Sequence, residues 1–158
     1  MVSACVQPML AAEPAATAGS HLYIAGAEIA ERIVKADAAA RSGTRLPGGA
    51  LLASGPYRAD MLYLTAPQKN SDLHPADAEL FVVLEGSGSM LMGGRLIEPT
   101  PRGTSLTSPT TEGGAEYKLA RGDMVLVPEN TPHKISAVTG ANLVVMTVHL
   151  PHPEPAPK

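Results

Sequence analysis

Between residues 46 and 150 the sequence consists of short apolar runs separated by turn-forming residues, and this pattern limits the possible folds strongly. The segment ALLASGPYRADMLYL, for example, has two apolar runs on either side of Gly55-Pro56. Gly and Pro number 15 each, which favours many turns between short strands over a helix bundle. We therefore predict an all-β sandwich or barrel over residues 46–150.

Three parts of this region have more specific predictions. The segment ELFVVLEGSGSMLMGG predicts a β-hairpin, because a Gly-Ser-Gly turn separates two apolar runs. Residues 103–114, GTSLTSPTTEGG, are polar and predict a long exposed loop. Residues 117–150 predict three more strands, with turn residues at 121–123, 128–132 and 139–142.

The segments that flank the predicted barrel differ from it in composition. Residues 1–20 predict a flexible arm, and residues 151–158, PHPEPAPK, predict a Pro-rich tail without regular hydrogen bonding. Residues 21–45 predict a helical segment. Its helix covers residues 25–40, which are rich in helix formers and in which Ile29, Ile33 and Val34 recur at helical spacing. We expect this one helix to pack against the barrel.

Length and charge exclude several classes of function. A chain of 158 residues suits one domain. The net charge is -3 and Lys and Arg do not cluster, which argues against nucleic acid or an anionic membrane as a partner. No apolar run reaches the roughly 18 residues of a membrane span.

The single cysteine, Cys5, excludes an intrachain disulfide. The sequence Val2-Ser3-Ala4-Cys5 is similar to the cleavage box of bacterial lipoproteins, but it lies too near the start to act without a further leader. Two locations stay open: cytoplasmic or, with such a leader, periplasmic and lipid-anchored.

The stretch SDLHPADAELFVVLEG places His74 between two acids, Asp72 and Glu79. Strand alternation puts Phe81 and Val83 on the face of Glu79, so this carboxylate opens inwards above a hydrophobic floor. A buried carboxylate is costly unless it is protonated or holds a cation. The alternative for His74 is a turn histidine that faces water.

A second histidine, His133, follows the turn at 128–132 and begins a strand. Two imidazoles and a carboxylate from neighbouring strands bind Fe(II), Mn(II), Ni(II) or Zn(II) and leave coordination positions open. We therefore predict a site for one divalent transition metal.

These two segments together resemble the two motifs of the cupins, which are small jelly-roll barrels. The first motif, G-x5-H-x-H-x3–4-E-x6-G, is matched by Asp72-x-His74-x4-Glu79-x6-Gly86. The second, G-x5-P-x-G-x2-H-x3-N, is matched by Gly122-x5-Pro128-x-Asn130-x2-His133. The resemblance covers about residues 50–150. It implies a cupin-type jelly-roll barrel, with His74, Glu79 and His133 as metal ligands.

The sequence departs from the cupin pattern at three more positions besides Asn130. Ala66 replaces the leading Gly, Ala137 replaces the final Asn, and Asp72 replaces the first metal-binding His. Asp72 is in place to be a fourth ligand, and it could instead bond a ligand's imidazole or hold a substrate.

The resemblance implies a metal-dependent enzyme acting on a small oxygen-bearing substrate, as a dioxygenase, isomerase, decarboxylase or lyase. Two alternatives are a non-catalytic small-molecule-binding or accessory cupin, and a seed-storage-like structural protein, which the length does not fit. Exposed sheet edges in small jelly rolls lead us to expect a homodimer.

Four other side chains complete the list of candidates. Tyr57 and Tyr63 precede the first motif, and Tyr63 is the candidate catalytic hydrogen-bond donor or general acid, with a strand position of no function as the alternative. His149 and His152 flank the Pro-rich tail, where we expect both to be exposed.

Overall fold

The computed structural model of the protein describes residues 21–44 and 49–152. In these ranges the elements follow in the order α1 (Gly26–Arg41), β1 (Gly49–Ser54), β2 (Tyr57–Leu64), β3 (Ser71–Leu73), β4 (Asp77–Met92), β5 (Arg95–Leu96), β6 (Thr100–Arg102), β7 (Ser105–Ser108), β8 (Thr111–Glu112), β9 (Ala115–Ala120), β10 (Met124–Val127) and β11 (His133–Pro151). The predictions for residues 1–20, Cys5 included, and for 153–158 lie outside the described residues.

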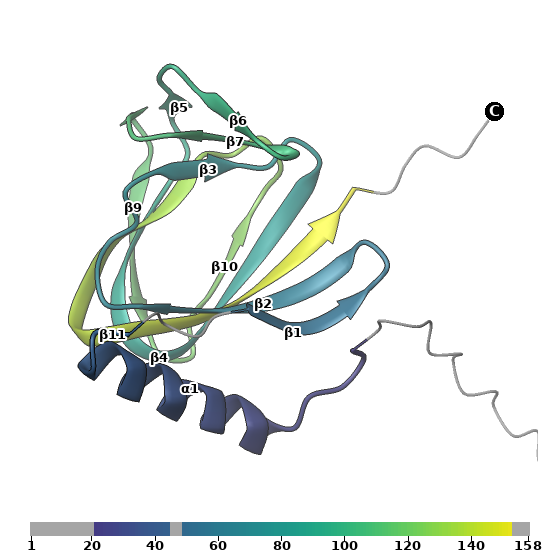
Figure 1. The fold of residues 1–158 in the computed structure, drawn as a ribbon. Coiled ribbons are helices and arrows are strands. Elements are labelled where there is room, and N and C mark those ends of the chain that lie inside the picture. Colours follow the sequence, from purple (N-terminus) through teal and green to yellow (C-terminus); the bar gives the residue numbers. More distant parts are fainter. Residues whose placement is uncertain (1–20, 45–48, 153–158) are drawn as a thin grey trace, which may run out of the picture.

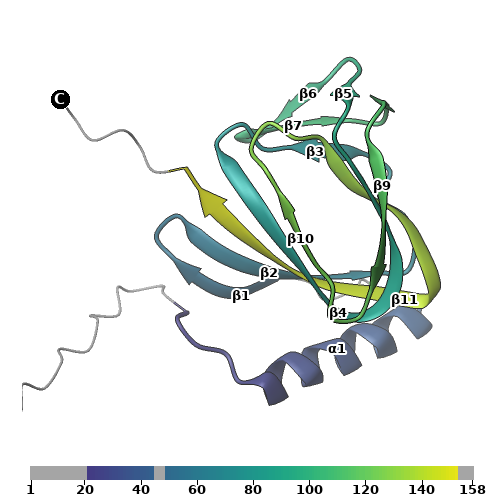
Figure 2. The ribbon, with the colours of Figure 1, turned by 180° about the vertical axis from the view of Figure 1, so that it is seen from behind.

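The strands curl into an antiparallel half-barrel, as Figures 1 and 2 show from two sides. The long strands β4 and β11 pair along most of their length and hold the sheet together. On one side β11 also pairs with β2 and β3, and on the other β4 pairs with β9 and β10. The predicted all-β barrel with one N-terminal helix is confirmed.

The hairpin that we predicted from ELFVVLEGSGSMLMGG is wrong, because residues 79–92 of this segment belong to the one continuous strand β4. Gly86 does not form a hairpin turn. It has φ of 78°, and a Cβ atom at Gly86 would lie 2.1 Å from the backbone oxygen of Asn142. The glycine therefore allows β11 to approach β4 closely at the point where both strands bend.

Three other sequence predictions need correction. The turn expected at 139–142 is an irregularity within β11, where the pairing shifts between Thr139 and Leu143. The loop expected over residues 103–114 contains the short strands β7 and β8. The tail expected from residue 151 begins later, since Pro151 pairs with Asp77 in the sheet.

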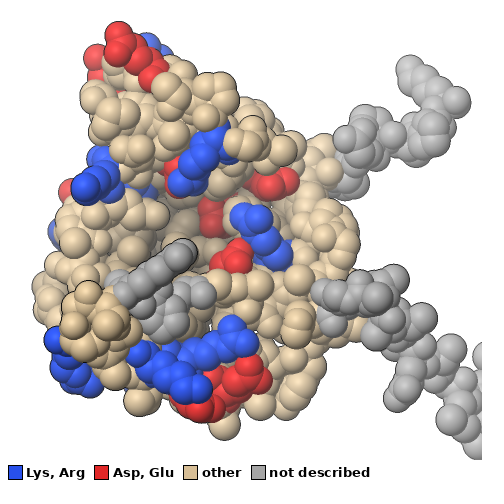
Figure 3. Space-filling view, viewed as in Figure 1, with Lys and Arg blue, Asp and Glu red and all other residues tan. Residues whose placement is uncertain are grey.

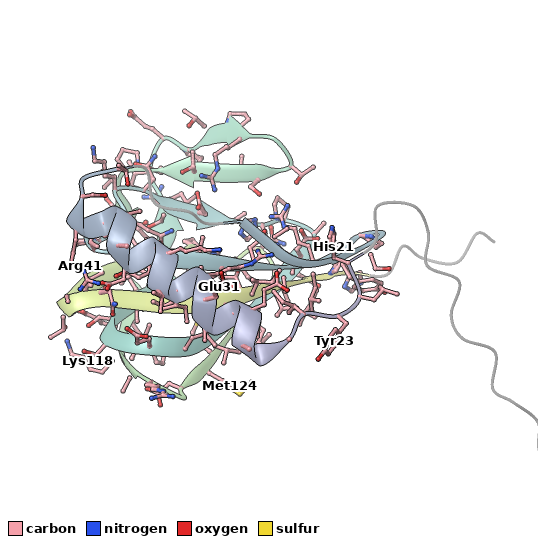
Figure 4. All side chains as sticks on the ribbon, turned by 60° about the horizontal axis from the view of Figure 1, so that its bottom comes forward. His21, Tyr23, Glu31, Arg41, Lys118 and Met124 are labelled. Carbon is pink, nitrogen blue, oxygen red and sulfur yellow. The ribbon has the colours of Figure 1, made fainter. Side chains whose placement is uncertain are left out.

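The sheet has a hydrophobic core on each face. Phe81, Val83, Ile135 and Val145 belong to the core inside the barrel. The outer core, which includes Met61, packs against α1. In Figures 1 and 4 the helix lies across the outer face of the sheet, and Figure 4 labels Glu31 and Arg41 on it.

The helix matches its predicted range within one residue at each end. It ends at Ser42-Gly43, where Gly43 has φ of 68°, a conformation that commonly closes helices. Only part of the predicted apolar stripe packs on the sheet, because Ile33 contacts the outer core while Val34 is 66% exposed. Among the described residues, no helix has the length and apolar character needed to span a bilayer.

Candidate metal centre

A cavity of about 280 Å³ is lined by side chains from β2, β3, β4, β6 and β11. Polar side chains predominate among them, although Leu62 and Phe81 also line the cavity. Figure 3 shows the hollow in the surface, with acidic and basic side chains close together around it.

Glu79 lies at the centre of a cluster of three histidines. Its Oε2 atom is 3.1 Å from Nε2 of His74 and 3.1 Å from Nε2 of His133. Its Oε1 atom is 3.4 Å from Nε2 of His149. The Glu79 and His133 residues are each 5% exposed and His149 is 7% exposed. Three imidazoles therefore converge on one buried carboxylate.

The local register explains how these side chains meet. On β4, alternation places Glu79, Phe81 and Val83 on the inner face, as predicted. His149 on β11 is paired with Glu79 in the ladder, and cross-strand partners have neighbouring side chains. His133 begins β11 after the turn at 128–132, which confirms the predicted turn and strand start.

Hydrogen bonds outside the cluster fix the orientation of two imidazoles. His133 Nδ1 lies 3.0 Å from the carbonyl oxygen of Thr131, which can only accept, so Nδ1 carries a proton. Arg58 Nη2 lies 3.0 Å from His149 Nε2, and a guanidinium can only donate. His149 Nε2 therefore carries a lone pair.

The charges of the cluster depend on one another. Burial alone would raise the pKa of Glu79, but hydrogen bonds from His133 and His74 and the positive charge of the histidines lower it below its ordinary value. Burial would lower the pKa of His133, yet its hydrogen bonds to Glu79 and Thr131 raise it. The pKa of His149 is lowered, chiefly by burial and also by Arg58.

The donor set suits a divalent transition metal, and the proton arrangement supports this. His133 Nε2 can contact the carboxylate at 3.1 Å only as a protonated donor, or with a cation between them. Its Nδ1–H is held by a backbone carbonyl, which is how metal-bound imidazoles are commonly oriented. His74, Glu79 and His149 offer ligand atoms that all lie within 4.8 Å of one another. The cluster can therefore exchange its protons for a metal ion.

His149 is the site residue that the sequence analysis missed, because it was expected to be exposed beside the Pro-rich tail. A signal was present in the strand VVMTVHL, where period-two alternation puts Val145, Thr147 and His149 on one face. All three are buried. The companion prediction for His152 differs, since His152 is exposed and hydrogen bonds to Glu129.

Asp72 lies beside the cluster and contacts a different partner. Its Oδ2 atom forms an ion pair at 2.6 Å with Nη2 of Arg102. Its Oδ1 atom is buried and has no hydrogen-bond partner among the described residues. The structure therefore brings Asp72 to the same cavity as His74 and His133 and pairs it with an arginine.

Tyr63 does not line this cavity. On β2 the side chains of Arg58, Asp60 and Leu62 face the cavity, whereas Tyr63 belongs to the outer core. Its hydroxyl donates to Asp37 of α1 at 3.0 Å. Burial, before any other cause, raises the pKa of Tyr63. The strand parity thus places this hydroxyl on the opposite face from the histidine cluster. Tyr57 is 60% exposed and also lies outside the cavity.

Comparisons with known proteins agree with the fold. No family profile matches the sequence, and no curated protein is significantly similar to it. Solved structures are similar: BH2720 from Bacillus halodurans is 15% identical, with a TM-score of 0.58 over 89% of both chains. A cupin protein, BF4112, from Bacteroides fragilis is 14% identical, with a TM-score of 0.51 over 71% of this chain and 82% of that one.

DMSP lyase DddQ from Ruegeria pomeroyi is also similar, at 21% identity over 75% of this chain and 53% of that one. Its TM-score is 0.48. The likeness to BF4112 shows the fold alone, and it shows that this chain has the cupin fold. The resemblance seen in the two sequence motifs is confirmed at that level.

Proposed function

We propose that this protein is a cupin that binds one divalent transition metal (Fe, Mn, Zn or Ni) in the barrel and acts as a metal-dependent enzyme. The observation that supports this is the convergence of three imidazoles on the buried Glu79 carboxylate. We assign Glu79, His74, His133 and His149 as the ligands. Imidazole and carboxylate donors suit these metals.

The assignment gives His149 the role of the imidazole that is missing at position 72. The cupin pattern has a histidine where this sequence has Asp72. Asp72 pairs with Arg102, while His149 Nε2 lies 3.4 Å from Oε1 of Glu79. His149, from the last strand β11, would thus supply the imidazole that the cupin pattern places at position 72.

The cavity is suited to a small oxygen-bearing substrate. Its volume of about 280 Å³ leaves room for a compact molecule, near the lower end of the usual range for ligand pockets. A bound divalent metal would act as a Lewis acid that polarises a substrate oxygen. Phe81 and Leu62 line the same cavity and would exclude water from one side of the substrate.

The test is the metal content of protein purified without an affinity tag. We expect about one metal ion per chain, and each of the variants His74→Ala, His133→Ala and His149→Ala should reduce the content to near zero. His152→Ala is the matched control, because His152 is exposed and outside the cluster.

Reconstitution distinguishes this proposal from its alternative. Metal-free protein should take up Zn(II) or Mn(II) with the release of protons, since His133 must give up its Nε2 proton to coordinate. A wild-type chain that binds none of Fe, Mn, Zn and Ni would favour a non-catalytic small-molecule-binding cupin. The expected homodimer stays a prediction, which sedimentation equilibrium would test.

A further inference from the structure

The rim of the metal cavity carries two arginines from separate strands. Arg58 lies on β2 and Arg102 lies on β6, and both line the cavity that contains Glu79. Their side chains are 57% and 61% exposed, whereas Glu79 is 5% exposed. The cavity therefore has cationic groups at its mouth and the histidine cluster in its interior.

Each arginine is held in place by an aspartate. Arg58 Nε lies 2.9 Å from Oδ2 of Asp60, and Arg102 Nη2 lies 2.6 Å from Oδ2 of Asp72. A guanidinium has five N–H donors. Among the described residues, Asp72 is the only hydrogen-bonding or ionic partner of the Arg102 guanidinium, so several of its donors remain available for a ligand.

The lining has a positive formal charge when a metal is bound and the imidazoles are neutral. Two arginines contribute +2 and Asp60, Asp72 and Glu79 contribute −3, which gives −1 with neutral imidazoles. A divalent cation changes this sum to +1. The metal-loaded cavity would then attract a small anion, with electrostatic attraction strengthened by the partly enclosed setting.

The Arg102–Asp72 pair offers a donor and an acceptor side by side. Arg102 can donate to a carboxylate in a bidentate manner. Asp72 Oδ1 is buried and lacks a hydrogen-bond partner among the described residues, and a buried acceptor of this kind is normally satisfied. A hydroxyl group next to the carboxylate of a ligand would satisfy it.

We propose that the site takes a small hydroxycarboxylate, whose carboxylate binds Arg102 and whose hydroxyl donates to Asp72 Oδ1 while a second oxygen group faces the metal. Arg58, from β2, contributes further positive charge to the cavity. This inference rests on the proposed metal function, and it gives Asp72 the role of a substrate-binding residue in place of a fourth metal ligand.

The experiment uses the full chain loaded with Zn(II), and titration calorimetry with two probes, hydroxymalonate and malonate. These diacids differ only in one hydroxyl. We expect hydroxymalonate to bind more tightly than malonate, at least fivefold. Arg102→Gln should weaken both about 10- to 100-fold, and Asp72→Asn should remove most of the difference between them. Zinc content should stay at one per chain in both variants.

Arg95→Gln is the control, because Arg95 is an exposed arginine that pairs with Glu112 away from the cavity. It should bind both diacids as the wild type does. The proposal is overturned if the zinc-loaded wild type binds neither diacid, if it binds both equally, or if Arg102→Gln stays within twofold of wild type.

Zinc content separates this proposal from the function on which it rests. If Asp72→Asn loses zinc as His74→Ala does, Asp72 is a metal ligand; the hydroxycarboxylate assignment then fails and the metal function stands. If the wild type itself binds no zinc or other divalent metal, the proposed function fails first.

Discussion

The two faces of the β2–β11 pair have the same backbone geometry and opposite chemistry. Towards the helix, Met61 and Val144 are buried against other apolar side chains. Towards the cavity, Thr147 and His149 are buried beside charged groups. Burying apolar surface stabilises a fold, whereas burying polar groups costs free energy unless partners satisfy them. The outer face thus supplies stability, and the inner face uses part of it to hold a reactive cluster.

The comparison predicts that a truncation on the outer face affects stability without affecting the site. Met61 is 2% exposed and packs in the outer core. Met61→Ala should lower the free energy of unfolding by about 2–5 kcal/mol, measured by denaturant unfolding, and leave metal content unchanged. Met124→Ala is the control, because Met124 is 62% exposed. Loss of metal from a folded Met61→Ala protein would show that the two faces are not separable.

On the inner face, replacement of Glu79 should affect stability in a pH-dependent manner. Glu79→Gln in metal-free protein should cost about 1–3 kcal/mol near neutral pH, because the histidines lose a charged hydrogen-bond partner. The pKa of Glu79 is lowered in the folded protein. Its contribution is therefore fully present above the unfolded pKa of about 4.3 and is lost as pH falls through the lower folded pKa.

Denaturant unfolding of both proteins at several pH values would measure this effect. The difference between wild type and Glu79→Gln should be largest above about pH 5 while His133 is protonated. It should shrink on acidification, and again as the pH rises through the raised pKa of His133. A difference that grew as the pH fell would contradict the assignment of Glu79 as an ionised carboxylate in the folded state.

Ser105 sharpens the comparison because it acts on the cluster from outside. Its hydroxyl lies 2.7 Å from Nδ1 of His74, and such outer partners orient metal-binding imidazoles. Ser105→Ala should weaken zinc affinity about 10-fold, measured by competition with a chelator, with little effect on unfolding. Thr104→Ala is the matched control on the neighbouring exposed residue. Equal affinities for Ser105→Ala and wild type would remove Ser105 from the site.

Tyr63 should have the smallest of these effects, and only on stability. Its hydroxyl donates to Asp37 and accepts from Nδ2 of Asn142 at 3.1 Å, which joins α1 to the sheet. Tyr63→Phe should reduce the free energy of unfolding by about 1 kcal/mol and leave metal content unchanged. Loss of activity in a Tyr63→Phe protein that keeps its metal would contradict a purely structural role for this hydroxyl.

Several features of the fold could be predicted from local sequence pattern. The helix over residues 25–40, the turn at Gly55-Pro56 and the inward face of Glu79, Phe81 and Val83 all follow from short-range periodicity and turn residues. Local sequence pattern did not predict the conformation at Gly86 correctly. A Gly-Ser-Gly segment is compatible with a turn and with a close approach between strands, and the second depends on Asn142, far away in sequence.

The site residues also divide into those predicted from local spacing and those placed by pairing across the sheet. The spacing from Asp72 to Gly86 and from Gly122 to His133 predicted His74, Glu79 and His133 as site residues. The structure brings both of these histidines to the Glu79 carboxylate. These positions depend on the turn and strand residues next to them, which are present in the sequence itself. Local order along the chain was therefore sufficient to find them.

His149 and the partner of Asp72 were decided by pairing across the sheet. The ladder places His149 beside Glu79, 70 positions earlier in the chain, and folding brings Arg102 to Asp72. Such contacts depend on the register between strands and on where β4 and β11 bend together, and these are properties of the assembled barrel. Neighbouring residues in the sequence carry no record of them, because a one-residue change in register would exchange the two faces of a strand.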